Sequence, residues 1–223
     1  MRILGIESSS RRGSVALLEG AQLIASLEHE QLNAHAERLL PLLERLLADA
    51  GWPKSSLDRL AVGVGPGSFT GLRAGIALAE GLSVGLDRPL WGVGSLLAMA
   101  RGALAEHSGP CCALLDARRS ELFAAVYDRE LRELSAPCAL PIEDLPSFLA
   151  ASGVVTVVGE VARTVDHGRV LASGPLLDLP HARWVAALAG ELDEASAPPE
   201  PQYVRGIGAT LPALPRSPIN PQE

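Results

Sequence analysis

The chain has 223 residues, 48% hydrophobic and 20% charged, so it carries enough apolar material for a buried core and is not a disordered chain. The formal net charge of −7 argues against the class of proteins that bind nucleic acid without a partner, because such proteins present a basic face to the phosphates. The sequence shows no leader peptide and no apolar run of membrane-spanning length, which predicts a cytoplasmic protein without membrane contact.

The first part of the chain predicts a meander of three strands followed by a helix. Apolar runs separated by turn residues cover residues 2–7, 14–20 and 22–30. Leucines then recur every three or four positions over 34–50, which is the period of one helix face. Asn33 and Gly51 supply end signals, and Pro41 predicts a kink or a new first turn.

Strands and helices alternate after this meander, which indicates an α/β protein. A lobe boundary is expected near residues 107–110, and a proline-rich stretch after Ala197 is expected to be poorly ordered near its end. The three cysteines have no CxxC spacing and are interpreted as reduced core thiols. In chain order, the predicted elements are strand 60–67, helix 70–86, strand 91–93, helix 95–106, strands 111–116, 121–127 and 154–160, and helix 181–192.

The strongest local signal is the glycine-rich segment 65–75, GPGSFTGLRAG, between a predicted strand and a predicted helix. Glycine amides and a helix N-terminus together can bind an anion. The spacing nevertheless fits neither GxxxxGK[ST] nor GxGxxG, and the segment contains no lysine. An anion site and a tight turn with close backbone approach therefore both stay open. The small residues of the following helix suggest close approach by another helix, within the chain or across an interface.

Residues 65–82, GPGSFTGLRAGIALAEGL, resemble the signature of the TsaB family (also called YeaZ). Further similar stretches are ILGIESSSRRGSVAL at 3–17, HAERLLPLLERLL at 35–47, DARRSELFAAVYD at 116–128 and PQYVR at 201–205. The resemblance implies an actin/hexokinase/Hsp70-like (ASKHA) α/β fold of two lobes, with mixed five-stranded sheets and a shortened second lobe. The expected lobes are 1–107 and 108–205, followed by a proline-rich tail at 206–223.

The same resemblance implies a function in tRNA modification. TsaB proteins are non-catalytic subunits that bind and activate TsaD. With the TsaE ATPase, they support transfer of a threonylcarbamoyl group from threonylcarbamoyl-AMP to N6 of adenosine 37 in tRNAs reading ANN codons (t6A formation). It further implies tRNA contact mainly through the complex and ATP only at the level of the complex. The apolar helical surface left in water predicts a homodimer when the chain is alone. Two alternatives remain. One is an autonomous ASKHA-type small-molecule kinase or ATPase, and the other, ranked last, is a glycoprotease-like peptidase.

No catalytic or metal-binding residue is expected. The histidine pair that binds metal in TsaD falls here on Ser95 and Met99, neither of which is a suitable ligand. ATP-hydrolysing relatives carry an Asp-x-Gly turn at the first hairpin, where this chain has Glu7 and three serines. That departure predicts no hydrolysis by the chain alone. Asp116, Arg118, Arg119 and Glu121 at the predicted hairpin could form a polar site, although arginine and glutamate in a turn more often form solvated surface.

Two sets of candidate residues follow. The expected partner interface is an apolar face on the first two helices, formed by leucines and a small-residue stripe: Leu39, Leu42, Leu43, Leu46, Gly71, Gly75, Leu78, Ala79 and Leu82. A weaker set is expected close to an anion or nucleotide: Glu7, Ser8, Ser9, Ser10, Gly65, Gly67 and Ser68.

Overall fold

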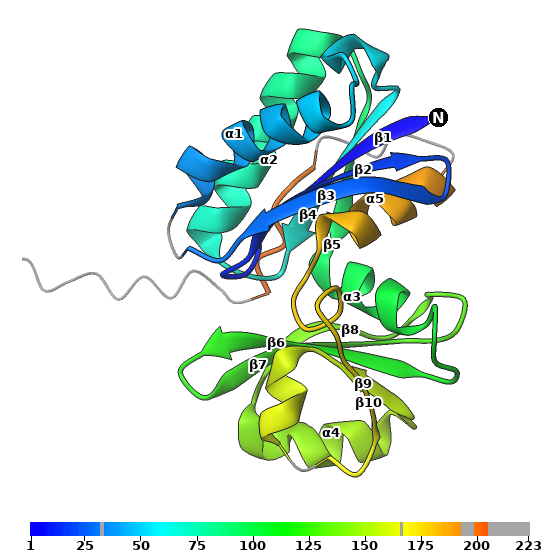
Figure 1. Ribbon diagram of the computed structural model, residues 1–223. Helices are drawn as coiled ribbons and strands as arrows, with labels where there is room; N and C mark the ends of the chain where they lie inside the picture. The colour runs from blue at the N-terminus through cyan, green and yellow to red at the C-terminus, as the bar shows by residue number, and fades with distance from the viewer. Residues whose placement is uncertain (32–33, 166, 193–198, 205–223) are drawn as a thin grey trace, which may run out of the picture.

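The computed structural model describes residues 1–31, 34–165, 167–192 and 199–204, and it contains two five-stranded mixed sheets (Figure 1). The first sheet has the strand order β3-β2-β1-β4-β5. Its antiparallel meander consists of β1 (Arg2–Glu7), β2 (Gly13–Glu19) and β3 (Gln22–His29). The remaining two strands run parallel to β1 and are β4 (Arg59–Gly65) and β5 (Leu90–Gly94).

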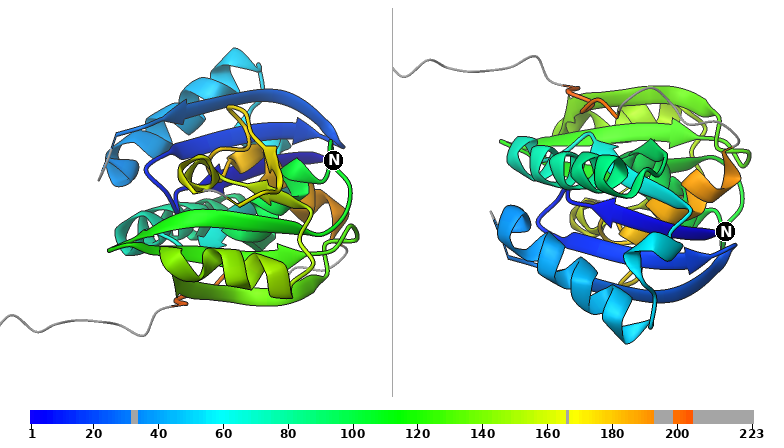
Figure 2. Two further views of the ribbon diagram at one scale, coloured as in Figure 1. Left: turned by 90° about the horizontal axis from the view of Figure 1, so that it is seen from below. Right: turned by 90° about the horizontal axis from the view of Figure 1, so that it is seen from above.

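Helices cover both faces of the first sheet. Successive side chains of a strand point to opposite faces. Leu4 and Ile6 of β1 accordingly pack beneath α1 (His35–Asp49) and α2 (Phe69–Leu86), whereas Ile3 packs on the opposite face against α5 (Ala182–Glu191). The views from above and below show α1 and α2 on the same side of the molecule (Figure 2).

The second sheet repeats the topology of the first, with the order β10-β9-β6-β7-β8. The outer face of this sheet is covered by α4 (Leu145–Ala151), while α3 (Ser95–Ala103) packs on its inner face and also reaches β5 and α5. Its strands are β6 (Cys111–Arg118), β7 (Glu121–Tyr127), β8 (Glu133–Pro141), β9 (Thr156–Val158) and β10 (Val170–Ala172).

Several elements differ from the sequence-based expectation. The expected second lobe, 108–205, includes α5, yet α5 packs on the first sheet because its alanine and valine side chains fit that face. Pro41 is exposed within α1, which runs uninterrupted. The expected strand 154–160 shortens to Thr156–Val158, and β8, β10 and α4 were not expected.

The ends of the helices follow local signals in part. Gly51 after α1 adopts φ 66°, the left-handed conformation that glycine adopts without penalty, as the end signal predicted. The expected cap Asn33 and the tail 206–223 lie outside the described residues. Within the described ranges, the helices are all too short or too polar to cross a bilayer.

Candidate functional site

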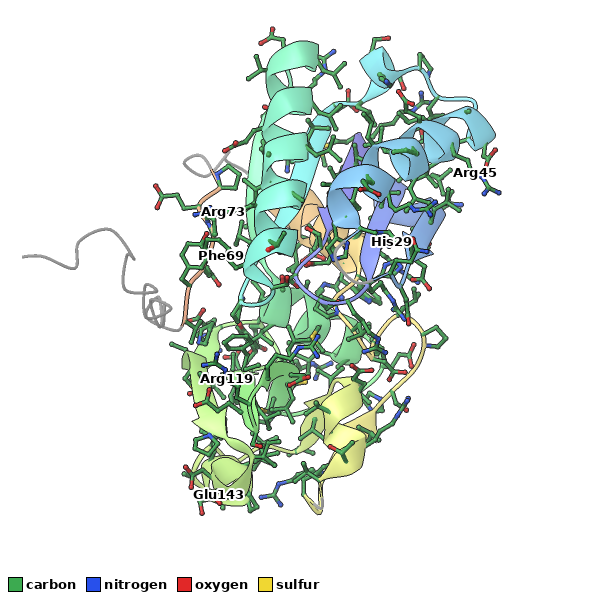
Figure 3. All side chains as sticks on the ribbon, turned by 90° about the vertical axis from the view of Figure 1, so that its left-hand side faces the viewer. His29, Arg45, Phe69, Arg73, Arg119 and Glu143 are labelled. Carbon is green, nitrogen blue, oxygen red and sulfur yellow. The ribbon has the colours of Figure 1, made fainter. Side chains whose placement is uncertain are left out.

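A cleft of about 720 Å³ opens between the two halves of the molecule. Its upper wall consists of the loop after β1, the first turn of α1 and the N-terminus of α2. Its lower wall consists of the end of β6, the following turn and Glu160. The segment 199–204, called the strap below, runs along one side and contributes Gln202, Tyr203 and Val204. Figure 3 shows Phe69 on the upper wall and Arg119 on the lower one.

The glycines of the segment 65–75 let α2 lie directly on the loop after β1. A Cβ atom at Gly67 would overlap the carbonyl oxygen of Ser9, and one at Gly71 would overlap the carbonyl oxygen of Ser8. Two hydrogen bonds hold the contact: the Ser68 N–H donates to the Ser9 carbonyl at 2.7 Å, and the Ser8 hydroxyl donates to the Gly71 carbonyl at 2.9 Å. Close backbone approach, one of the two interpretations left open by the sequence, is therefore confirmed.

Glu7 lies beneath the cleft and does not line it. Its carboxylate is fully buried, and it accepts hydrogen bonds from the N–H groups of Ser8 and Ser9 at 2.7 and 2.6 Å and from the Ser95 hydroxyl at 2.8 Å. Burial raises the pKa of Glu7, and these donated hydrogen bonds oppose that rise. The carboxylate thus holds the loop to β4 and α3, and it is not placed to meet a phosphate or a metal.

Ser95→Ala is expected to destabilise the fold by about 1–3 kcal/mol, because it leaves one Glu7 oxygen and the Gly65 N–H without a partner. Loss of a donor raises the pKa of Glu7 further. The charged form of Glu7 therefore costs more in the variant, and Glu7 takes up this form only as the pH rises through its raised folded pKa. Ser95→Ala should consequently destabilise the fold more at pH 8 than at pH 5.

Urea unfolding at the two pH values measures this effect, and Glu7→Gln provides the matched background. In that background the Ser95→Ala loss should no longer depend on pH. A loss that is already independent of pH with Glu7 present would show that the Ser95 hydroxyl does not stabilise a charged carboxylate.

Arginines of the first loop tie the two halves together. Arg11 pairs with Glu160 across the cleft. Arg12 is buried, pairs with Glu28 and Glu30 of the β3 region, and donates to the Pro175 carbonyl. On the opposite wall, Arg118, Arg119 and Ser120 all have positive φ (65°, 56° and 60°), and the two arginines line the cleft. Arg118 and Arg119 are exposed, as the solvated-surface interpretation expects, and they also form a wall of the cleft.

The residues of the expected partner interface face the interior of the chain and not its surface. Leu39, Leu43, Leu46, Gly71, Gly75 and Ala79 are buried in the chain's own core, and Leu42, Leu78 and Leu82 are half-buried against it. The reason is that α1 and α2 turn their leucine and small-residue stripes towards the first sheet. The exposed face of α2 lies on roughly the opposite side of the helix and comprises Phe69, Thr70, Arg73, Ala77, Glu80, Gly81, Val84 and Gly85.

The weaker candidates divide into two groups. Ser9, Ser10, Gly67 and Ser68 line the cleft, whereas Glu7, Ser8 and Gly65 do not. Ser68 caps α2, since its hydroxyl accepts from the Gly71 N–H at 3.2 Å.

Ser95 and Met99 are buried, and the described ranges hold no group of three or more His, Cys, Asp or Glu side chains suited to a metal. No local pattern singles out Phe69 or Tyr203, although both lie in stretches that resemble the TsaB family.

Solved structures place the chain in a fold class. A structure from Pseudomonas aeruginosa, described as an uncharacterized protein with similarity to peptidase YEAZ, is 31% identical and aligns with a TM-score of 0.76, covering 92% of this chain and 99% of that one. The activator of 2-hydroxyisocaproyl-CoA dehydratase from Clostridium difficile aligns with a TM-score of 0.56 at 14% identity, covering 88% and 100%. These alignments and the duplicated sheets define an α/β protein of the actin/hexokinase-like class.

Sequence comparisons then identify the family. A family model described as TsaD, tRNA N6-adenosine threonylcarbamoyltransferase, matches residues 23–150. The tRNA threonylcarbamoyladenosine biosynthesis protein TsaB of Escherichia coli is 38% identical over 131 residues, which are 58% of this chain and 56% of that protein. The chain belongs to the TsaB (YeaZ) family. It spans about half the length of the curated relatives that it matches.

Proposed function

We propose that this chain is the accessory subunit that binds and activates TsaD in the complex that forms t6A on tRNA. The complex transfers the threonylcarbamoyl group from threonylcarbamoyl-AMP to N6 of adenosine 37 in tRNAs reading ANN codons. The observation that carries the proposal is the exposed face of α2, an apolar and small-sided surface on a chain of the TsaB family.

The α2 face is shaped for another helix. Val84 is 85% exposed, and a Cβ atom built on Gly81 or Gly85 would meet nothing within 4 Å apart from its own stretch of helix backbone. Small side chains allow a second helix to approach to about 8 Å between axes, the short end of the usual range. The match to the TsaD model covers α1 and α2, so TsaD is expected to have a similar pair of helices. Two such related faces can pair about an approximate two-fold axis.

The proposal also covers TsaE, ATP, tRNA and the state of the chain without TsaD. TsaE supplies ATPase activity, and ATP is used by the complex rather than by this chain alone, which the inward position of Glu7 supports. The acidic chain contacts tRNA mainly through the complex, in the cytoplasm. Without TsaD, the same α2 face pairs with a second copy, because apolar surface left in water costs about 25 cal/mol per Å².

Ala77→Glu is expected to weaken binding of purified TsaD by at least ~100-fold. Ala77 is exposed at the centre of the α2 face, so the fold should tolerate glutamate. In the complex, an unpaired buried carboxylate costs about 3–5 kcal/mol, and each 1.4 kcal/mol corresponds to about tenfold in affinity. Isothermal titration calorimetry measures the affinity, and sedimentation of the free variant should show a monomer.

Ala150→Glu is the matched control, an exposed helical alanine on α4, far from this face. It should bind TsaD like the wild type. Wild-type affinity in Ala77→Glu would remove the α2 face from the interface. Failure of the wild-type chain itself to bind TsaD would overturn the proposed function, and ATP turnover by the isolated chain would favour the autonomous kinase alternative.

A further inference from the structure

Two exposed aromatic side chains meet at the mouth of the cleft, although they are far apart in the sequence. Phe69 at the start of α2 is 46% exposed and Tyr203 of the strap is 43% exposed. Their ring centres lie 5.3 Å apart with a tilt of 33°. Aromatic rings left in water at one point of a surface form an apolar patch that a partner can cover.

Arg73 joins the two rings into one unit. Its guanidinium carbon lies 3.9 Å from the centre of the Phe69 ring, and its Nε donates to the Tyr203 hydroxyl at 3.4 Å. We call Phe69, Arg73 and Tyr203 the aromatic cluster. Figure 3 shows Phe69 and Arg73 side by side next to the strap. No carboxylate in the described part of the chain pairs with Arg73.

The aromatic cluster is held in place before any partner binds. The Gln202 N–H donates to the Val64 carbonyl of β4 at 2.7 Å, which anchors the strap one residue before Tyr203. At the other end of the strap, Pro199 packs on Gly92 so closely that a Cβ atom there would lie 2.9 Å from the proline Cβ. A side chain whose position is already restricted loses less conformational entropy on binding.

The aromatic cluster continues the α2 face. Phe69, Arg73 and Ala77 follow one another at intervals of four residues, so they lie along one side of the helix. Aromatic residues and arginine are enriched among the few side chains that contribute most to protein–protein affinity. A single-stranded RNA partner is disfavoured by the net charge of −7 and by Glu80 on the same face.

We infer that the aromatic cluster anchors the interface with TsaD, so that the strap near the C-terminal end of the fold is part of the binding surface. The inference rests on the proposed function. Arg73 forms no ion pair with a described carboxylate, and neither does Arg119 on the facing wall of the cleft. The TsaD surface that covers the aromatic cluster therefore carries carboxylates.

The test is the affinity of the full-length chain for purified TsaD, measured by calorimetry at low and high salt. Tyr203→Ala and Phe69→Ala should each weaken binding by at least ~30-fold, the effect of an interface hot spot. Tyr203→Phe keeps the ring and should bind nearly as the wild type does. Arg73→Gln should weaken binding at low salt, and its affinity should depend less on salt than that of the wild type.

Leu134→Ala is the matched control, because Leu134 is 53% exposed on β8 and away from the cleft. Thermal melting of every variant should match the wild type, which separates lost contacts from a misfolded chain. If Ala77→Glu abolishes binding while Tyr203→Ala binds normally, the inference is wrong and the proposed function stands. If wild type does not bind TsaD, both are wrong.

Two other results would also overturn the inference. Equal salt dependence of wild type and Arg73→Gln would show that no partner carboxylate meets Arg73. Weaker tRNA retention by the Tyr203→Ala complex, with unchanged affinity for TsaD, would identify the aromatic cluster as an RNA contact instead.

Discussion

Gly75→Glu is expected to leave little or no folded protein at room temperature. Gly75 is buried on the side of α2 that faces β1, where a Cβ atom would overlap the Ser8 hydroxyl. A glutamate there would overpack the contact and bury a charge without a partner, at a combined cost of several kcal/mol. Since a domain of this kind is stable by only about 5–15 kcal/mol, this loss removes most or all of its stability.

Far-UV circular dichroism and the yield of soluble protein measure this outcome, and Gly81→Glu is the matched control on the same helix. Gly81 is exposed with open space around it, so its variant should fold and gain about 1 kcal/mol of helix propensity. Gly75→Ala should fall between the two, because only the Ser8 hydroxyl must move. A Gly75→Glu protein that melts within a few degrees of wild type would disprove the close packing of α2 on the first loop.

Stability is expected to fall by about 3 kcal/mol between pH 7 and pH 4 because of His181. This side chain is 1% exposed and caps α5, since its Nδ1 accepts from the Arg183 N–H at 3.0 Å. Burial, and then the charges of Arg12 and Arg183, lower the pKa of His181 to about 4. Its Nε2 lies 3.4 Å from an oxygen of Glu28, a side chain that is 41% exposed and also pairs with Arg12.

The fall in stability at low pH follows from the protons that His181 binds in the unfolded and the folded state. In the unfolded chain, a histidine has a pKa of about 6.5. Between that value and about pH 4 the unfolded state therefore binds a proton that the folded state does not. The stabilising contribution is complete above the unfolded pKa and is lost as the pH falls towards the folded one, at about 1.4 kcal/mol for each unit of difference.

A further histidine, His29, adds to the loss in the same direction. The His29 Nδ1 accepts from the Gln31 N–H at 3.3 Å, and its Nε2 lies 3.2 Å from the His35 Nδ1. The His35 Nε2 in turn lies 3.0 Å from the Ser10 carbonyl oxygen. Each ring nitrogen of His29 and His35 thus has a hydrogen-bond partner. Burial, followed by the nearby His35 and Arg38, lowers the pKa of His29.

Urea unfolding between pH 4 and pH 8 tests the role of His181, with His181→Asn as the comparison. Asparagine can cap a helix but does not titrate. The free energy of unfolding of His181→Asn should therefore depend less on pH, and the remaining slope reports the other groups. Identical slopes for wild type and variant would show that His181 is not neutralised by folding.

The first sheet and its helices could be predicted from the sequence because their signals are local. Alternating apolar runs placed β1, β2 and β3, and the leucine period placed α1 with Gly51 at its end. The missed elements lack such signals. The strand β8 mixes polar and apolar residues with a proline, and α4 and β10 are only seven and three residues long.

By itself, the sequence determined the fold class and the family signature, and it offered a close contact at the glycines of α2 as one of two interpretations. Only the tertiary structure decided which surfaces meet, because a helix period defines an apolar stripe without saying whether a sheet or a partner covers it. The Gly75 stripe meets the chain's own loop at Ser8 and not another protein. Likewise, contacts between distant segments brought Tyr203 to Phe69 and turned Glu7 towards Ser95, and no local pattern encodes such contacts.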